Sequence, residues 1–92
     1  MIPLDPQARP RLARRARLRW DPRARRHLLL YPERGLELDD NAAAIVHLCD
    51  GTRRIAEIAG ELHRAHPHDE LARIERDVTA FLDALRSRGL IE

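Results

Sequence analysis

Side chains that could carry out chemistry are few in this sequence. His63, His66 and His68 form the one cluster with metal-ligand chemistry. They lie together at a helix end and in the loop after it, whereas zinc sites hold Cys and His ligands from separate elements in tetrahedral geometry. We therefore expect a solvated loop here, without a metal or a cofactor.

Nucleophilic catalysis is disfavoured by the composition. The chain has one cysteine, Cys49, expected to face the core, one serine, Ser87, expected near an exposed helix end, and no lysine. A nucleophile needs a neighbouring base and a third group that orients the base, and no such spacing occurs. Asp50-Gly51-Thr52 is too short to form a phosphate-binding loop. The sequence indicates a protein that is not an enzyme.

Length and composition indicate one small domain. The chain has 92 residues, 43% of them hydrophobic, which is enough for one core. A single cysteine excludes an intramolecular disulfide and fits the cytoplasm. The N-terminus has no signal-peptide pattern and no apolar run reaches membrane-spanning length, so we expect a soluble intracellular protein without membrane contact.

The charge is divided unevenly along the chain. Residues 1–34 carry ten arginines against three acidic residues, whereas residues 35–92 carry seven arginines against twelve acidic residues. Residues 1–16 also hold three prolines and lack periodicity, which predicts a flexible or loosely docked Arg-rich arm and a folded domain over 17–92. A long arm could be exchanged between protomers, so a homodimer formed by arm or strand exchange is a further expectation.

The most strongly patterned element is a helix within residues 69–91. Asp69 is expected to cap its N-terminus, and Gly89 followed by Leu90 is typical of a C-terminal cap. Six apolar residues share one face at helical spacing and are expected to pack into the core. They are Leu71, Ile74, Val78, Phe81, Leu82 and Leu85.

Upstream of this helix, alternation and turn residues predict three short strands over 17–20, 27–31 and 36–38. We expect Leu28 and Leu30 to face the core, and Leu29 and Tyr31 to lie on the opposite face.

Two helices follow, one starting after the Asp39-Asp40 pair and ending at Asp50-Gly51, the other capped by Thr52. The second shows helical spacing of Ile55, Ile58, Ala59 and Leu62.

The predicted order β-β-β-α-α-α defines an α+β fold, a small winged-helix-like domain with a three-stranded antiparallel sheet followed by a three-helix bundle. Two functions fit it. A winged-helix DNA-binding protein would use the Arg-rich arm, but acidic residues on the last helix would repel phosphates. A peptide-binding protein would use the short edge strand over 36–38, with the amide of Leu38 pairing with an incoming strand. We favour the peptide and expect no nucleic-acid partner.

Several motifs resemble the PqqD family, the pyrroloquinoline quinone (PQQ) biosynthesis proteins D, over residues 17–92. The matching residues are Arg17-Leu18-Arg19-Trp20, Leu28-Leu29-Leu30-Tyr31-Pro32-Glu33, Leu38, Ala43-Ala44-Ile45, Cys49-Asp50-Gly51, Ile55-Ala56-Glu57-Ile58, Asp77-Val78, Phe81-Leu82 and Arg88-Gly89-Leu90-Ile91. The resemblance implies a non-catalytic peptide chaperone. Such a protein binds the precursor peptide PqqA and presents it to the radical SAM enzyme PqqE, whose iron–sulfur chemistry crosslinks a Glu and a Tyr of the peptide.

The resemblance also implies where the peptide binds. In similar recognition elements a leader peptide adds as a strand beside the third strand, in the groove against the third helix. Helical geometry combined with this resemblance gives the expected peptide-binding residues. They are Leu36, Glu37 and Leu38 on the strand, and Arg73, Asp77, Ala80, Phe81 and Ala84 on the helix.

Overall fold

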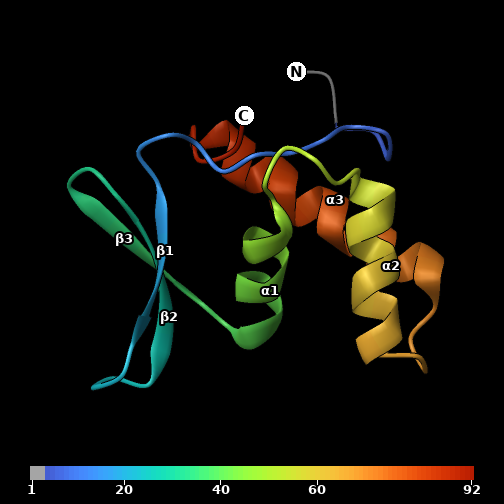
Figure 1. Cartoon of the computed structure of the whole chain (residues 1–92), viewed down its shortest axis with the longest axis horizontal. Coiled ribbons are helices and arrows are strands. Elements are labelled where there is room, and N and C mark those ends of the chain that lie inside the picture. The colour runs from blue at the N-terminus through green and yellow to red at the C-terminus, as the bar shows by residue number, and fades with distance from the viewer. Residues whose placement is uncertain (1–3) are drawn as a thin grey trace.

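The computed structural model describes residues 4–92 and confirms the predicted α+β fold, with three antiparallel strands followed by three helices (Figure 1). The description as winged-helix-like holds only loosely, because here the sheet precedes the helices. The elements are β1 (Arg17–Asp21), β2 (Arg26–Tyr31), β3 (Arg34–Leu38), α1 (Asp40–Leu48), α2 (Ile55–Ala65) and α3 (Leu71–Ser87). None of the helices in the described part is long and apolar enough to cross a membrane.

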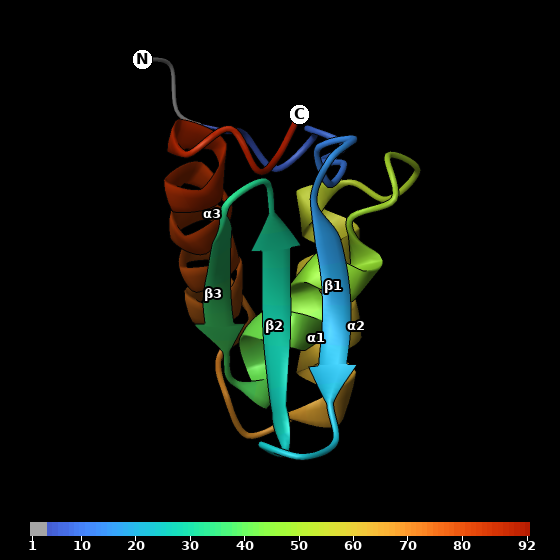
Figure 2. The ribbon, with the colours of Figure 1, turned by 90° about the vertical axis from the view of Figure 1, so that its left-hand side faces the viewer.

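The sheet has the order β1-β2-β3, so β1 and β3 are both edge strands (Figure 2). In the register of the sheet Leu18 is opposite Leu29, and Leu29 is opposite Leu36. Residues opposite each other in antiparallel strands share a face, so these three leucines point to the same side. That side is the core, because Leu29 is completely buried.

The expected orientation of β2 is therefore wrong. Leu29 and Tyr31 face the helices, while Leu28 and Leu30 lie on the outer face of the sheet and are half-buried. Three consecutive leucines give no alternation, so the β2 sequence alone fits either orientation equally well. The neighbouring strands decide it, because Leu18 and Leu36 supply apolar partners only for the Leu29 face.

The helices begin with different caps. Helix α1 begins at the expected Asp39-Asp40 pair, and Asp39 caps it, since its carboxylate accepts a hydrogen bond from the amide of Ala42 at 2.7 Å. Helix α2 begins after Arg54, whose amide donates to the carboxylate of Glu57 at 3.0 Å. The expected cap at Thr52 is wrong, because the Thr52 hydroxyl and amide both donate to Asp50 in the preceding turn.

Helix α3 buries part of its predicted stripe. Val78, Leu82 and Leu85 are buried, whereas Ile74 and Phe81 are half-buried and Leu71 is 45% exposed. Leu71 is the first residue of the helix and lies at the end of the stripe furthest from the buried positions. The residue that precedes the helix is Glu70, without a side-chain hydrogen bond, so the expected cap at Asp69 is also wrong.

The end of α3 matches its prediction. Gly89 has φ +75°, its amide donates to the carbonyl of Arg86, and the amide of Leu90 donates to the carbonyl of Leu85. This pair of bonds is the Schellman motif, which favours glycine at the left-handed position. Leu90 is buried beneath it and joins the core.

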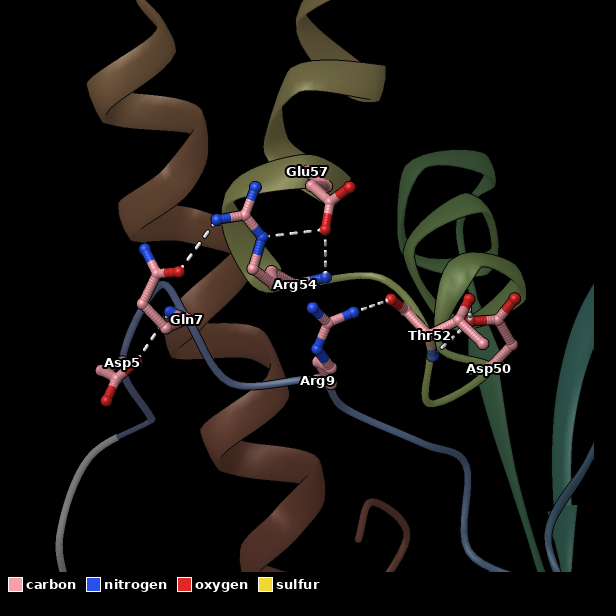
Figure 3. A network of polar contacts seen from close by, with 7 residues as sticks. All are labelled: Asp5, Gln7, Arg9, Asp50, Thr52, Arg54 and Glu57. Atoms are coloured by element: carbon pink, nitrogen blue, oxygen red, sulfur yellow. Dashed lines mark hydrogen bonds and ion pairs between the residues drawn. The ribbon is translucent and has the colours of Figure 1, made fainter.

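Residues 4–16, here called the N-terminal segment, lie against the helical body. Main-chain hydrogen bonds join Leu12 to Cys49, Ala13 to Leu90, and Arg11 to Glu92 in both directions. Figure 3 shows the polar contacts of its first half, in which Arg9 donates to the carbonyl of Thr52 and Gln7 accepts from Arg54 at 2.9 Å. Pro10 and Ala16 are buried.

For residues 1–16 the sequence left open a flexible or a loosely docked arm, and residues 4–16 are docked in the structure. The sequence pattern did not specify these contacts because the segment is held mainly by its main chain, which any residue type supplies. Residues 1–3 of the expected arm lie outside the described residues. How readily the docked segment opens stays a prediction.

Candidate functional site

The open edge of β3 is the first component of the site. The two-residue turn at Pro32–Glu33 places Tyr31 opposite Arg34, and antiparallel pairing then alternates along the strand. By this alternation the main-chain groups of Arg34, Leu36 and Leu38 point toward β2. Those of Gly35 and Glu37 point away from the sheet and are available to another strand.

This register corrects the expectation for Leu38, whose amide is directed toward β2 and not toward an incoming strand. The free donor nearest to it is the amide of Glu37. The side chain of Glu37 points to the outer face of the sheet, where its carboxylate lies 3.6 Å from the guanidinium of Arg26.

Helix α3 is the second component. It lies behind β3 and reaches past it on the side away from β2 (Figure 2). We call the space between residues 34–39 and residues 77–88 the β3–α3 seam. Leu36 on the strand and Phe81 on the helix are half-buried and pack against the core, to which the buried Val78 and Leu85 of the same helix belong.

A pocket of about 280 Å³ opens at one end of the seam, where β3 passes into α1. Apolar side chains from all three helices form its wall, and three carboxylates stand around it. Its lining consists of Asp39, Asn41, Ala42, Ile45, Leu62, His66, Asp69, Ile74, Asp77, Val78 and Phe81.

A second hollow lies at the other end of the seam, between the β2–β3 turn and the end of α3. Tyr31, Pro32, Arg34 and Arg88 line it. One end of the seam is therefore a basic hollow and the other an acidic pocket, and along β3 and α3 the half-buried Leu36 and Phe81 stand between the residues of these ends.

The predicted site residues are distributed over this seam as follows. Asp77 and Phe81 line the acidic pocket, and Leu36 and Leu38 face the helices from the strand. Glu37 contributes its main chain to the open edge. Arg73, Ala80 and Ala84 are exposed on α3 and line neither hollow.

Sequence patterning did not indicate several pocket residues, above all Ile45, Leu62 and His66. Ile45 belongs to α1, Leu62 belongs to α2, and His66 is the residue at which α2 ends. Helical spacing identified Leu62 as a core residue. That they border an opening follows only from how the three helices meet.

The thiol of Cys49 and the hydroxyl of Ser87 are engaged in structural contacts. Burial, followed by the charge of Asp50, raises the pKa of the Cys49 thiol to about 12, and its Sγ donates to the carbonyl of Ile45 at 3.2 Å. The Ser87 hydroxyl donates to the carbonyl of Asp83. Within residues 4–92 no three His, Cys, Asp or Glu side chains are grouped to hold a metal ion.

An open edge strand beside apolar side chains is a surface that can bind an extended peptide by strand addition. Comparison with known proteins shows the family to which the chain belongs. The family model for "Coenzyme PQQ synthesis protein D (PqqD)" matches residues 26–91. The chain belongs to the PqqD family, which is non-catalytic, so this protein is not an enzyme.

Individual relatives agree with this assignment. A "PqqA binding protein" of Azotobacter vinelandii is 43% identical over 83 residues, which cover 90% of this chain and 88% of the relative. The solution structure of the PqqD truncation of Methylobacterium extorquens PqqCD, described as a stand-alone RiPP recognition element, superimposes with a TM-score of 0.83. It is 37% identical, and the match covers 97% of this chain and 94% of that one.

A more distant structure shares the fold. Lasso peptide synthetase B1, solved in complex with the leader peptide, superimposes with a TM-score of 0.75 at 23% identity. The match covers 92% of this chain and 99% of that one.

Proposed function

We propose that this protein binds the precursor peptide PqqA as an added strand along β3 and presents it to the radical SAM enzyme PqqE. The open edge of β3 beside the apolar β3–α3 seam is the observation that carries this proposal. The outward main-chain groups of Gly35 and Glu37 provide hydrogen bonds, and the seam accepts alternate side chains of the peptide. The name of the Azotobacter vinelandii relative supports PqqA as the ligand.

The protein contributes binding and orientation, and the crosslinking chemistry belongs to PqqE. Extending a precursor peptide along a rigid edge reduces the conformational freedom that the enzyme must otherwise overcome. In this proposal the complex forms in the cytoplasm, as the single buried Cys49 suggests.

The working unit in this proposal is one chain, because the N-terminal segment docks on its own body. Exchange of this segment, or pairing of free edges, between two copies is the alternative arrangement. Light scattering of the protein with and without PqqA distinguishes the two arrangements.

The deciding experiment is a pair of NMR titrations of the labelled protein, one with PqqA and one with random duplex DNA. We expect PqqA to bind with micromolar or tighter affinity, about −8 kcal/mol or better. Amide shifts should concentrate at residues 35–38 and 77–84. DNA should bind weakly and lose affinity steeply with salt, because only the N-terminal arginines favour it. Salt-resistant DNA shifts along α3, without peptide shifts, would refute the proposal.

The role of presentation needs its own measurement. PqqE is incubated with PqqA and the products are analysed by mass spectrometry with and without the protein. We expect the crosslinked peptide to accumulate only when the protein is present. Equal crosslinking in its absence would leave peptide binding intact and refute presentation.

A further inference from the structure

Each wall of the β3–α3 seam carries a basic residue at the end near the β2–β3 turn and an acidic residue at the end near α1. On the strand, Arg34 begins β3 and Asp39 directly follows it, which separates them by about 16 Å in an extended chain. On the helix, Arg88 follows α3 and Asp77 lies eleven residues, or about 16 Å, before it. Arg34 and Arg88 line one hollow together, and Asp39 and Asp77 line the other.

These charged groups are available to a ligand. Arg34, Arg88, Asp69 and Asp77 are exposed, and the ion pairs observed within residues 4–92 involve other side chains. Asp39 caps α1 but is also exposed.

No charged side chain interrupts the seam between its ends. On the strand, the half-buried Leu36 and the buried Leu38 point toward the helices, while Glu37 points to the outer face. On the helix, Phe81, Ala84 and Leu85 lie between Asp77 and Arg88 at helical spacing. An extended segment in the seam therefore contacts apolar side chains in its middle, acidic side chains at one end and basic side chains at the other.

We propose that the seam selects a peptide by the order of its charges, an inference that rests on the proposed function. Antiparallel pairing continues the pattern of the sheet and is slightly more stable per residue than parallel pairing. An antiparallel strand places its N-terminal end beside the acidic pocket and its C-terminal end beside Arg34 and Arg88. The preferred ligand thus carries a basic residue, an apolar stretch and then an acidic residue about five positions later.

The two ends act separately in physiological salt. Their distance of about 16 Å exceeds the Debye length of about 8 Å, so each end senses mainly its own partner. A peptide with the reverse order places like charges together at both ends. Exposed charge pairs have modest effects, so we expect the wrong order to weaken binding about tenfold in total.

A charge-exchange experiment tests this inference. PqqA is synthesised with each acidic residue changed singly to lysine and each basic residue changed singly to glutamate. Binding is measured to the wild type, to Arg34→Glu/Arg88→Glu and to Asp69→Lys/Asp77→Lys. Arg19→Glu/Arg23→Glu makes the same change of net charge as the first variant at exposed positions outside the seam, and serves as its control.

We expect one acid-to-lysine peptide to bind the wild type about fivefold more weakly and to regain affinity with Arg34→Glu/Arg88→Glu but not with the control. A basic-to-glutamate change about five positions earlier should regain affinity with Asp69→Lys/Asp77→Lys. Both effects should shrink in 0.5 M salt.

Binding of PqqA along residues 35–38 without such exchange, or with the opposite order, overturns charge selection and leaves the proposed function standing. Failure of wild-type protein to bind PqqA overturns the proposed function and this inference with it.

Discussion

At the scale of single residues, the main-chain amide of Glu37 has a defined role in strand addition. Its register on the edge strand directs it away from β2, so Glu37→Pro removes a donor from the free edge without removing one from the sheet. We expect this variant to stay folded and to lose at least tenfold in affinity for PqqA. Glu37→Ala is the matched control, because it loses the exposed contact with Arg26 but keeps the amide. Equal affinities of the two variants would exclude pairing at this position.

Phe81 contributes to the pocket as well as to the core. Its ring is half-buried, so Phe81→Ala should cost about 2 kcal/mol, less than the roughly 3–5 kcal/mol for a fully buried ring. Leu82→Ala, at a fully buried position outside the pocket, should cost about 2–5 kcal/mol. At a temperature where both are folded, only Phe81→Ala should weaken PqqA binding. Denaturant unfolding measures the stability of the two variants, and calorimetric titration measures their affinity for PqqA. Weaker binding by Leu82→Ala than by Phe81→Ala would place the site away from Phe81.

The spacing of apolar residues predicted the buried positions well where that spacing followed the helical period clearly. Val78, Leu82 and Leu85 on α3, and Ile55, Ile58 and Ala59 on α2, are buried as expected. The Leu28–Leu30 run has no period, and its orientation depends on β1 and β3. The basic end of the seam was not predicted, because Arg34 and Arg88 are far apart in the chain and meet only in the folded protein.

At the scale of elements, the start of α2 and the turn before it depend on ionised carboxylates. Hydrogen bonds from the Thr52 hydroxyl and amide, with the nearby Arg53, lower the pKa of Asp50 from 3.8 to about 2. Hydrogen bonds from the Arg54 amide and side chain lower the pKa of Glu57. Both groups are acidic with a depressed folded-state pKa, so each stabilises the folded protein above its ordinary pKa, which is 3.8 for Asp50 and 4.5 for Glu57. The stabilisation is lost as the pH falls through the folded-state pKa, which is about 2 for Asp50.

The double variant Asp50→Asn/Glu57→Gln tests this assignment. The side-chain amides of the new Asn and Gln can still accept a hydrogen bond but do not titrate in this range. We expect the free energy of unfolding of the wild type to fall more steeply between about pH 4 and pH 2 than that of the variant. Parallel curves from chemical denaturation at stepped pH would show that other carboxylates cause the acid sensitivity.

Cap residues were predicted unevenly because capping depends on local geometry. Gly89 matches its expected role, and the helix start expected at the Asp39-Asp40 pair is confirmed, since both follow from a clear change in the sequence pattern. Thr52 and Asp69 have suitable side chains, yet Asp50 engages Thr52, and the chain turns through His66 to Asp69 before α3 begins. A suitable residue one or two positions before the helix start is indistinguishable by composition from a true cap.

At the scale of the whole molecule, the N-terminal segment closes the fold around both the α1–α2 connection and the C-terminus. It forms isolated bridges from Arg11 to Asp50 and from Leu12 to Ile91. Figure 1 shows it crossing above α1 and α2 and passing beside the C-terminal end of α3. The open edge of β3 lies outside these contacts, so the segment stabilises the body without covering the proposed site.

Deleting residues 1–13 should therefore destabilise the protein while leaving the peptide site in place. Seven main-chain hydrogen bonds join residues 6–13 to the body, each with a net contribution of about 0.5–1.5 kcal/mol before the entropy of ordering the segment is subtracted. We expect a loss on the order of 2–4 kcal/mol, which lowers the melting temperature by roughly 10–20 °C for a domain of this size. Arg11→Ala is the control, because it removes only the exposed contact with Glu92 at 3.8 Å and keeps the main-chain bonds. In the full-length protein the amides of Leu12, Ala13 and Glu92 should exchange slowly with solvent. A truncated protein that melts within about 3 °C of the wild type, together with fast exchange at these amides, would show that the segment opens as readily as the flexible arm expected from its sequence.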